Sequence, residues 1–177
     1  MRSFDKSVPG PTLRLKPGDR LEIKIENKLE KRPRGNIVWN ELSHSNRTIL
    51  HVHGLHVDPK GMGDNMFVNV EAQSSRDYHY ELPPDHPAGT FWGHPHSHGS
   101  SMIQTAYAMA FPIIVEDLEL PKMLRNIHER VLVVQEVEYG TKSGRKKFIF
   151  SHLHISHQDV HTPHCALTPT SQVILWK

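Results

Sequence analysis

Apolar and polar residues alternate along much of the first two thirds of the chain. Leu21, Ile23 and Ile25 alternate with charged residues, which is the pattern of a strand that buries one of its faces. Tyr78 and Tyr80 belong to a second alternating stretch. Turns that contain glycine or proline separate these stretches at short intervals, and no long amphipathic helix interrupts them. The pattern predicts an all-β fold, either a sandwich or a barrel.

The same pattern suggests where the fold ends. Further strands are expected at 48–57 and 90–92, and an apolar run at 106–115 is expected to close the region. We therefore predict one domain over residues 1–117. Residues 118–177 are expected to form a linker that is helical around 123–130, one buried strand at 131–134 that opens a second unit, and a poorly matched histidine-rich, irregular tail.

Composition limits the range of functions. The net charge of the 177-residue chain is only +2 with neutral histidine, so a nucleic-acid partner is not expected. No apolar run reaches the roughly 18 residues of a membrane-spanning helix, so no membrane partner is expected. The N-terminus has no apolar stretch typical of a signal peptide, and the cellular location stays open. Histidine is unusually abundant at 15 residues, which permits metal binding or a response to pH.

Two His-x-His pairs stand out among the histidines, His51 with His53 and His94 with His96. Residues i and i+2 of a strand point to the same face, so each pair presents two imidazoles side by side. Four imidazoles without a thiolate or a carboxylate suit copper or zinc better than magnesium or calcium. A single pair of this kind also occurs by chance on strands, and it is the presence of two pairs that favours a metal site.

Other histidine-based metal folds fit the sequence poorly. A metallo-β-lactamase has aspartate and histidine shortly after its second histidine, where this chain has Leu55 and His56. A cupin requires a glutamate a few residues after His53, and the next one is Glu71. An amidohydrolase barrel needs a longer chain than this one.

The residues that flank the two pairs carry a family resemblance. In chain order they are Pro9-Gly10-Pro11-Thr12-Leu13-Arg14, Pro17-Gly18-Asp19, Asn27-Lys28-Leu29, His51-Val52-His53-Gly54-Leu55, Gly89-Thr90-Phe91-Trp92-Gly93-His94-Pro95-His96 and Ile113-Ile114-Val115-Glu116-Asp117. This series resembles the N-terminal cupredoxin domain of the multicopper oxidases, the family of the laccases. The resemblance implies a cupredoxin-like (plastocyanin-like) Greek-key β-sandwich, and it continues more weakly into what looks like the entry to a second domain.

The resemblance also implies roles for individual residues. His51 corresponds to a ligand of the type 2 copper, whereas His53, His94 and His96 correspond to ligands of the type 3 copper pair. In the family these three coppers form a cluster that reduces O2 to water, with electrons delivered from a separate type 1 copper. Asp64 falls where the family often has an acidic residue credited with supplying protons, although it could equally be an ordinary turn residue.

The remaining histidines are not expected to be ligands. His98 extends the second pair, and His56 is expected to face the surface. A third His-x-His pair at His152 and His154 lacks the flanking residues of the family's later motifs. The others that lie before the tail are expected to be ordinary, namely His44, His79, His86 and His128.

Several positions depart from the family pattern. Gly93 replaces an aromatic residue before the second pair, which predicts a loss of packing beside the cluster. Ala72-Gln73 replaces Pro-Gly, and Ala108 and Phe111 stand where the family usually has glycine. These changes leave the four histidines in place and indicate a divergent member.

The type 1 copper signature is missing, because Cys165 follows His164 but no histidine comes after it. We therefore expect a partial chain that needs other cupredoxin domains or subunits to react with O2 and a reducing substrate. Two alternatives stay open, a non-catalytic module that binds or buffers copper and a degenerate structural β domain.

Overall fold

The computed structural model describes 2–31, 44–124, Ile127, 129–135 and the backbone of the strands at 138–142, 145–149, 153–157 and 173–175. His128, His152, His164 and Cys165 lie outside these residues. Of the segment expected to be helical, Met123 and Leu124 form a turn.

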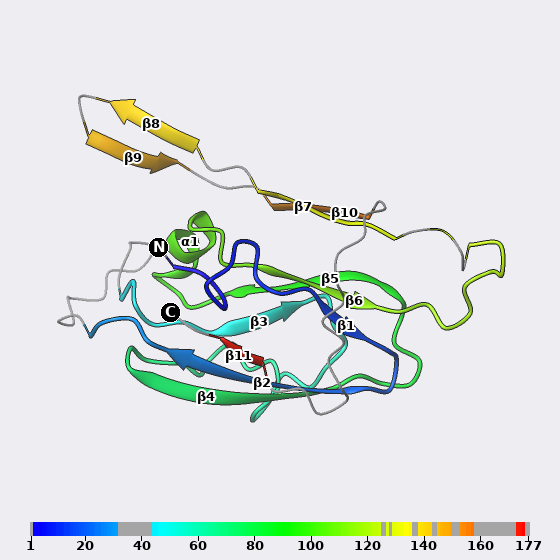
Figure 1. Cartoon of the computed structure of the whole chain (residues 1–177). Helices are drawn as coiled ribbons and strands as arrows, with labels where there is room; N and C mark the ends of the chain where they lie inside the picture. The colour runs from blue at the N-terminus through cyan, green and yellow to red at the C-terminus, as the bar shows by residue number, and fades with distance from the viewer. Residues whose placement is uncertain are drawn as a thin grey trace.

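Two β-sheets face each other and form the body of the protein (Figure 1). The first sheet has the order β1-β6-β5-β3, with β1 at Leu13–Leu15, β6 at Phe111–Val115, β5 at Gly89–Pro95 and β3 at Leu50–His53. The second has the order β11-β2-β4, with β11 at Val173–Leu175, β2 at Arg20–Asn27 and β4 at Ser74–Glu81. The prediction of an all-β, cupredoxin-like sandwich is confirmed.

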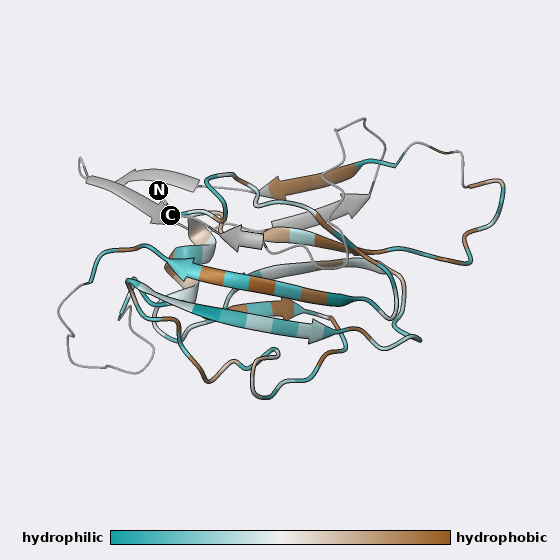
Figure 2. Ribbon diagram, turned by 60° about the horizontal axis from the view of Figure 1, so that its bottom comes forward, coloured by the Kyte–Doolittle hydropathy of each residue, from teal (hydrophilic) through white to brown (hydrophobic). Residues whose placement is uncertain are grey.

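The alternation along β2 builds the inner face of the second sheet (Figure 2). Leu21, Ile23 and Ile25 are each at most 3% exposed, while the residues between them contact solvent. The antiparallel register places Leu21 opposite Tyr80 and Ile23 opposite Tyr78, and both tyrosine rings are fully buried. The inner face therefore consists of the residues that the sequence pattern identified.

The first sheet supplies the opposite half of the core. Leu50 and Val52 of β3 are buried, and every residue of β6 is buried between β1 and β5. β1 runs parallel to β6, whereas β5 runs antiparallel to both β6 and β3. Residues from both sheets belong to one continuous hydrophobic cluster, so the sandwich has a single core.

A short helix, α1 at Ser101–Ala106, follows the second histidine pair and was not expected from the sequence. Six residues are too few to display a helical period, so the pattern could not reveal it. Gln104 on this helix is fully buried, and its amide donates hydrogen bonds to the carbonyls of Ser45 and Arg47. Among the described residues, no helix is long and apolar enough to cross a membrane.

Of the described strands after residue 118, four form two small antiparallel pairs, and β11 joins the second sheet beside β2, so the prediction of a single strand followed by an irregular tail is wrong. β7 at Val131–Gln135 pairs with β10 at Leu153–His157, and β8 at Glu138–Lys142 pairs with β9 at Arg145–Ile149. β7 lies where a strand was expected, but Leu132 and Val134 are 50% and 49% exposed, so the prediction of a buried strand is wrong. The division of the chain at residue 117 stays a prediction.

The expected loss of packing at Gly93 does not occur, because an aromatic ring from the neighbouring strand takes the space. Gly93 of β5 lies opposite Phe111 of β6. A Cβ atom added to Gly93 would lie 2.2 Å from Cζ of Phe111, closer than any real contact. The two departures from the family pattern therefore complement each other across one strand pair.

The other two departures retain a glycine-like backbone. Gln73 and Ala108 have φ angles of 60° and 63°, in the left-handed region that favours glycine. Both positions therefore keep the turn that a glycine would form, at some cost in backbone strain. The amide of Gln73 donates hydrogen bonds to the carbonyls of Lys28 and Leu29, which helps to hold its turn.

Candidate metal centre

The pairing of β3 with β5 brings the two His-x-His pairs together. Their antiparallel register places His51 directly opposite His94 and His53 opposite Trp92. The backbone N–H of His96 donates to the carbonyl of Ile49, which continues the pairing beyond the end of β5. The four imidazoles therefore share the sheet face opposite to the one that enters the core.

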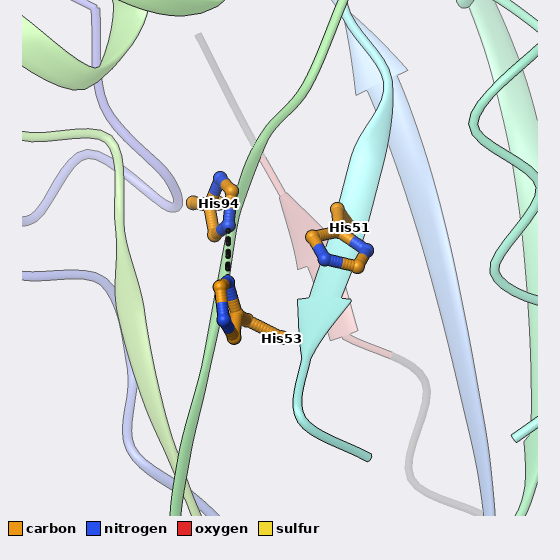
Figure 3. Close-up of side chains that lie close together, drawn as sticks. All are labelled: His51, His53 and His94. Atoms are coloured by element: carbon orange, nitrogen blue, oxygen red, sulfur yellow. Dashed lines mark hydrogen bonds between the residues drawn. The ribbon is translucent and has the colours of Figure 1, made fainter. Parts of the chain in front are cut away.

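The four rings form a compact cluster on that face. The centroid of the His51 ring lies 5.4 Å from that of His53, 5.1 Å from that of His94 and 5.1 Å from that of His96. Nδ1 of His53 lies 3.3 Å from Nε2 of His94, as the dashed line in Figure 3 marks. One ring nitrogen from each of His51, His53 and His94 lies within 4.8 Å of the others, which is close enough to hold a metal ion.

Trp92 forms a flat support for two of these rings. Its indole stacks on His94 at 4.1 Å between centroids and on His53 at 5.4 Å. The two histidines come from different strands, so one indole sets the ring planes of both. Trp92 lies two residues before His94 on the same strand face, and this spacing could have revealed the contact in the sequence.

Both carboxylate oxygens of Asp64 contact β3, one at the His51 ring and one at the backbone of the next residue. Oδ2 lies 2.7 Å from Nδ1 of His51, and Oδ1 accepts a hydrogen bond from the backbone N–H of Val52 at 3.1 Å. A carboxylate only accepts, so Nδ1 of His51 carries a proton, and Nε2 is the ring nitrogen left to bind a metal. The turn that carries Asp64 thus fixes both the orientation and the tautomer of His51.

Burial keeps two of the imidazoles neutral. His94 is 9% exposed, and burial lowers its pKa from 6.5 to about 4. Burial also lowers the pKa of His96. A neutral imidazole has a free lone pair, so both side chains are in the form that binds metals.

These residues fit a bound transition metal. Nδ1 of His94 lies 3.1 Å from the carbonyl oxygen of Pro95 and donates to it, which leaves Nε2 as the acceptor that faces His53. Two nitrogens that bind one ion at about 2.0–2.1 Å in a tetrahedral arrangement lie about 3.3 Å apart, so the observed separation suits a shared ion. An all-imidazole donor set suits copper or zinc.

The other histidines with described side chains lie outside the cluster. His98 is exposed, with its ring 6.3 Å from that of His96. His56 is exposed as expected, and His79 is exposed on β4 in the opposite sheet. His86 was expected to be ordinary but is buried, and its contacts bear on the loop that follows His53.

Comparison with known proteins gives consistent matches. Residues 36–119 match a family model described as "Multicopper oxidase". The chain is 28% identical over 146 residues to the iron transport multicopper oxidase FET3 of Candida albicans, which covers 81% of this chain and 20% of that protein. It is 27% identical over 114 residues to a multicopper oxidase of Staphylococcus aureus, which covers 64% of this chain and 22% of that protein.

A solved structure agrees with these matches. The multicopper oxidase from Campylobacter jejuni, a metallo-oxidase, has a TM-score of 0.52 at 28% identity, over 66% of this chain and 21% of that one. The chain spans about a fifth of the length of the curated relatives it matches. Fold, sequence matches and histidine pattern agree in their similarity to the multicopper oxidase family, whose members bind copper.

Proposed function

We propose that this domain supplies half of the ligands of a copper cluster at which O2 is reduced to water. The observation that carries the proposal is the meeting of four imidazoles on one face of the β3–β5 pair. By resemblance to the family, His51 binds the type 2 copper, and His53, His94 and His96 bind the type 3 pair. Copper bound there would supply the electron-transfer chemistry for O2 reduction.

The ring positions support this division of ligands. Nδ1 of His53 and Nε2 of His94 face each other at 3.3 Å, which suits binding of the same ion. His51 is oriented separately through Asp64, and this supports its assignment to a different ion. His96 lies next to both His51 and His94, with ring centroids 5.1 and 5.8 Å away.

The surrounding residues prepare the imidazoles for binding. The Trp92 indole covers one side of His94 and His53 and excludes water from that side. Burial keeps His94 neutral well below pH 6.5, so protons compete weakly with a metal for its Nε2. The strand register holds His51 and His94 opposite each other before any ion binds.

Asp64 acts first as an orienting group in this proposal. Both of its oxygens already accept hydrogen bonds, one from the His51 ring and one from the Val52 amide. O2 reduction consumes protons, and a carboxylate next to a ligand ring is placed to pass one on. Proton supply by Asp64 is therefore the second part of the role we propose for it.

Four imidazoles are too few for three copper ions, and the family takes the remaining ligands from another cupredoxin domain. We propose that such a domain, in the same parent protein or in a second subunit, completes the cluster and provides the type 1 copper. O2 and a reducing substrate would then be the reactants. The isolated chain should therefore bind copper but should not sustain O2 consumption.

Copper binding at the four histidines is testable with purified protein. We expect the wild type to bind Cu²⁺ as measured by metal analysis and EPR, and a His94→Ala/His96→Ala double variant to lose at least about 100-fold in affinity because two ligands are gone. His79→Ala is the matched control, since this exposed histidine lies in the other sheet. Equal binding by the double variant would contradict the proposed site.

Sustained O2 uptake separates the two parts of the proposal. The copper-loaded chain is mixed with a one-electron donor, and O2 is followed with an electrode. Stoichiometric copper binding without uptake is the expected result, because the type 1 signature is absent from the sequence. Sustained uptake that the His94→Ala/His96→Ala variant abolishes would contradict the need for further ligands.

A further inference from the structure

His86 occupies a buried position between the two segments that carry the ligands. It is 3% exposed and lies in the turn that leads into β5. The backbone N–H of His56 donates to its Nε2 at 3.0 Å, and its Nδ1 lies 2.8 Å from the carbonyl oxygen of Pro87. The ring therefore connects the loop after β3 to the turn before β5.

These two partners define the state of the ring. A backbone N–H only donates and a carbonyl only accepts, so the His86 imidazole is neutral with its proton on Nδ1. Both ring nitrogens are used, which leaves none for a metal ion. The role of His86 is therefore to hold the backbone.

The backbone that His86 holds begins directly after a proposed ligand. His53 is the last residue of β3, and Gly54 follows it with a φ angle of 86°. A Cβ atom at Gly54 would lie 2.9 Å from the ring of Phe91, so the chain passes close to this ring. Phe91 in turn contacts the His86 ring edge-on, at 5.2 Å between centroids and an angle of 74°. Gly54, Phe91 and His86 thus form one packed unit behind the end of β3.

Within the part of the chain that the structure describes, the His53 side chain is oriented mainly by its neighbours in the cluster. It is exposed, and its ring contacts are those with Trp92, His51 and His94 inside the cluster. The direction in which the side chain leaves the sheet therefore depends on the backbone at the end of β3. That backbone is held two residues beyond Gly54, where the backbone N–H of His56 donates a hydrogen bond to Nε2 of His86.

We propose that His86 is a positioning residue for His53. By anchoring the His56 amide, it keeps the His53 ring stacked on Trp92 with Nδ1 facing Nε2 of His94. The consequence for copper rests on the function proposed above, whereas the consequence for the metal-free protein does not.

Two substitutions distinguish positioning from simple packing. In His86→Leu the side chain fills space but leaves the His56 N–H and the Pro87 carbonyl without their partner. In His86→Gln an amide oxygen can accept from His56 while the amide nitrogen donates to Pro87. Leu21→Ala, in the β2 strand of the opposite sheet, is the control for lost stability without a change in this loop.

The first readout uses the metal-free protein. Stacking on Trp92 shifts the ring-proton NMR signals of His53, and the bond to His86 slows exchange of the His56 amide. We expect His86→Leu to lose the shift and the protection, whereas His86→Gln and Leu21→Ala keep both. Retention of both signatures in His86→Leu would overturn the proposal.

The second readout is copper affinity. We expect His86→Leu to bind Cu²⁺ about 10-fold more weakly than the wild type, and His86→Gln to stay within about 3-fold. A loss in His86→Leu no greater than in Leu21→Ala would also overturn the proposal. Failure of the wild type to bind copper would contradict the proposed function instead, and the metal-free NMR comparison would still decide the role of His86.

Discussion

The two sheets of the sandwich have similar inner faces and different outer faces. Inside, alternate apolar residues of both sheets meet in one core. Outside, β2 and β4 carry exposed ion pairs such as Arg20 with Glu81. The outer face of β3 and β5 instead carries four imidazoles and Trp92, with His94 only 9% exposed.

The comparison shows which part of the sheet determines the chemistry. The inner face fixes the register, and the register decides which outer residues become neighbours. A slip of one residue between β3 and β5 would move His94 away from its place opposite His51 and onto the core face. The core residues of the inner face do not contact the metal site, but through the register they determine which histidines meet there.

The largest effect is expected where β5 meets β6. Phe111→Ala should lower the free energy of unfolding by about 3–5 kcal/mol, because it empties the space beside Gly93. Gly93→Tyr should also destabilise, because its side chain would overlap the Phe111 ring. The double variant Gly93→Tyr/Phe111→Ala should lose less than the sum, as measured by denaturant unfolding. Strictly additive losses would show that the two residues do not compensate each other.

The second-largest effect is expected in the pH dependence of the stability of the metal-free protein. The pKa of His94 is about 4 in the folded state and 6.5 in the unfolded chain. Between these values the unfolded state binds more protons, so stability is present above pH 6.5 and falls by about 3 kcal/mol as pH drops to 4. Comparing unfolding of the wild type with that of His94→Gln isolates this contribution. A stability difference between the two that does not change with pH would contradict it.

A smaller effect is expected at Asp64. Asp64→Asn removes the charge and one of the two acceptors that serve His51 and Val52, so copper affinity should fall about 10- to 100-fold. Asp77→Asn, at an exposed position of β4, is the matched control. Equal copper affinities of the two variants in titrations would show that Asp64 is an ordinary turn residue.

The smallest effect is expected on the outer face of the second sheet. The side chains of Arg20 and Glu81 are 63% and 68% exposed, so Arg20→Ala should cost less than about 1 kcal/mol of stability. Copper affinity should not change, since the pair lies in the other sheet. A loss of stability above about 2 kcal/mol in thermal or chemical unfolding would contradict the proposed difference between the two outer faces.

The sequence was informative where a property depends on neighbouring residues. The period of Leu21, Ile23 and Ile25 predicted the half-buried strand, and the i, i+2 spacing predicted that His51 and His53 share a face. The all-β class followed from many such stretches and the turns between them.

The rest depends on contacts between distant segments. The exposure of Leu132 and Val134 depends on what packs against β7, which their own apolar run does not encode. The complementarity of Gly93 and Phe111 depends on strand register, and the role of His86 depends on where the loop after His53 folds. No local pattern contains this information.

The central claim is that copper binds on the outer face of the β3–β5 pair. Anomalous X-ray scattering from crystals of the copper-loaded protein, recorded on both sides of the copper absorption edge, locates the metal directly. The account predicts a peak about 2 Å from both Nδ1 of His53 and Nε2 of His94. Copper found only at other histidines, with no peak at this pair, would contradict it.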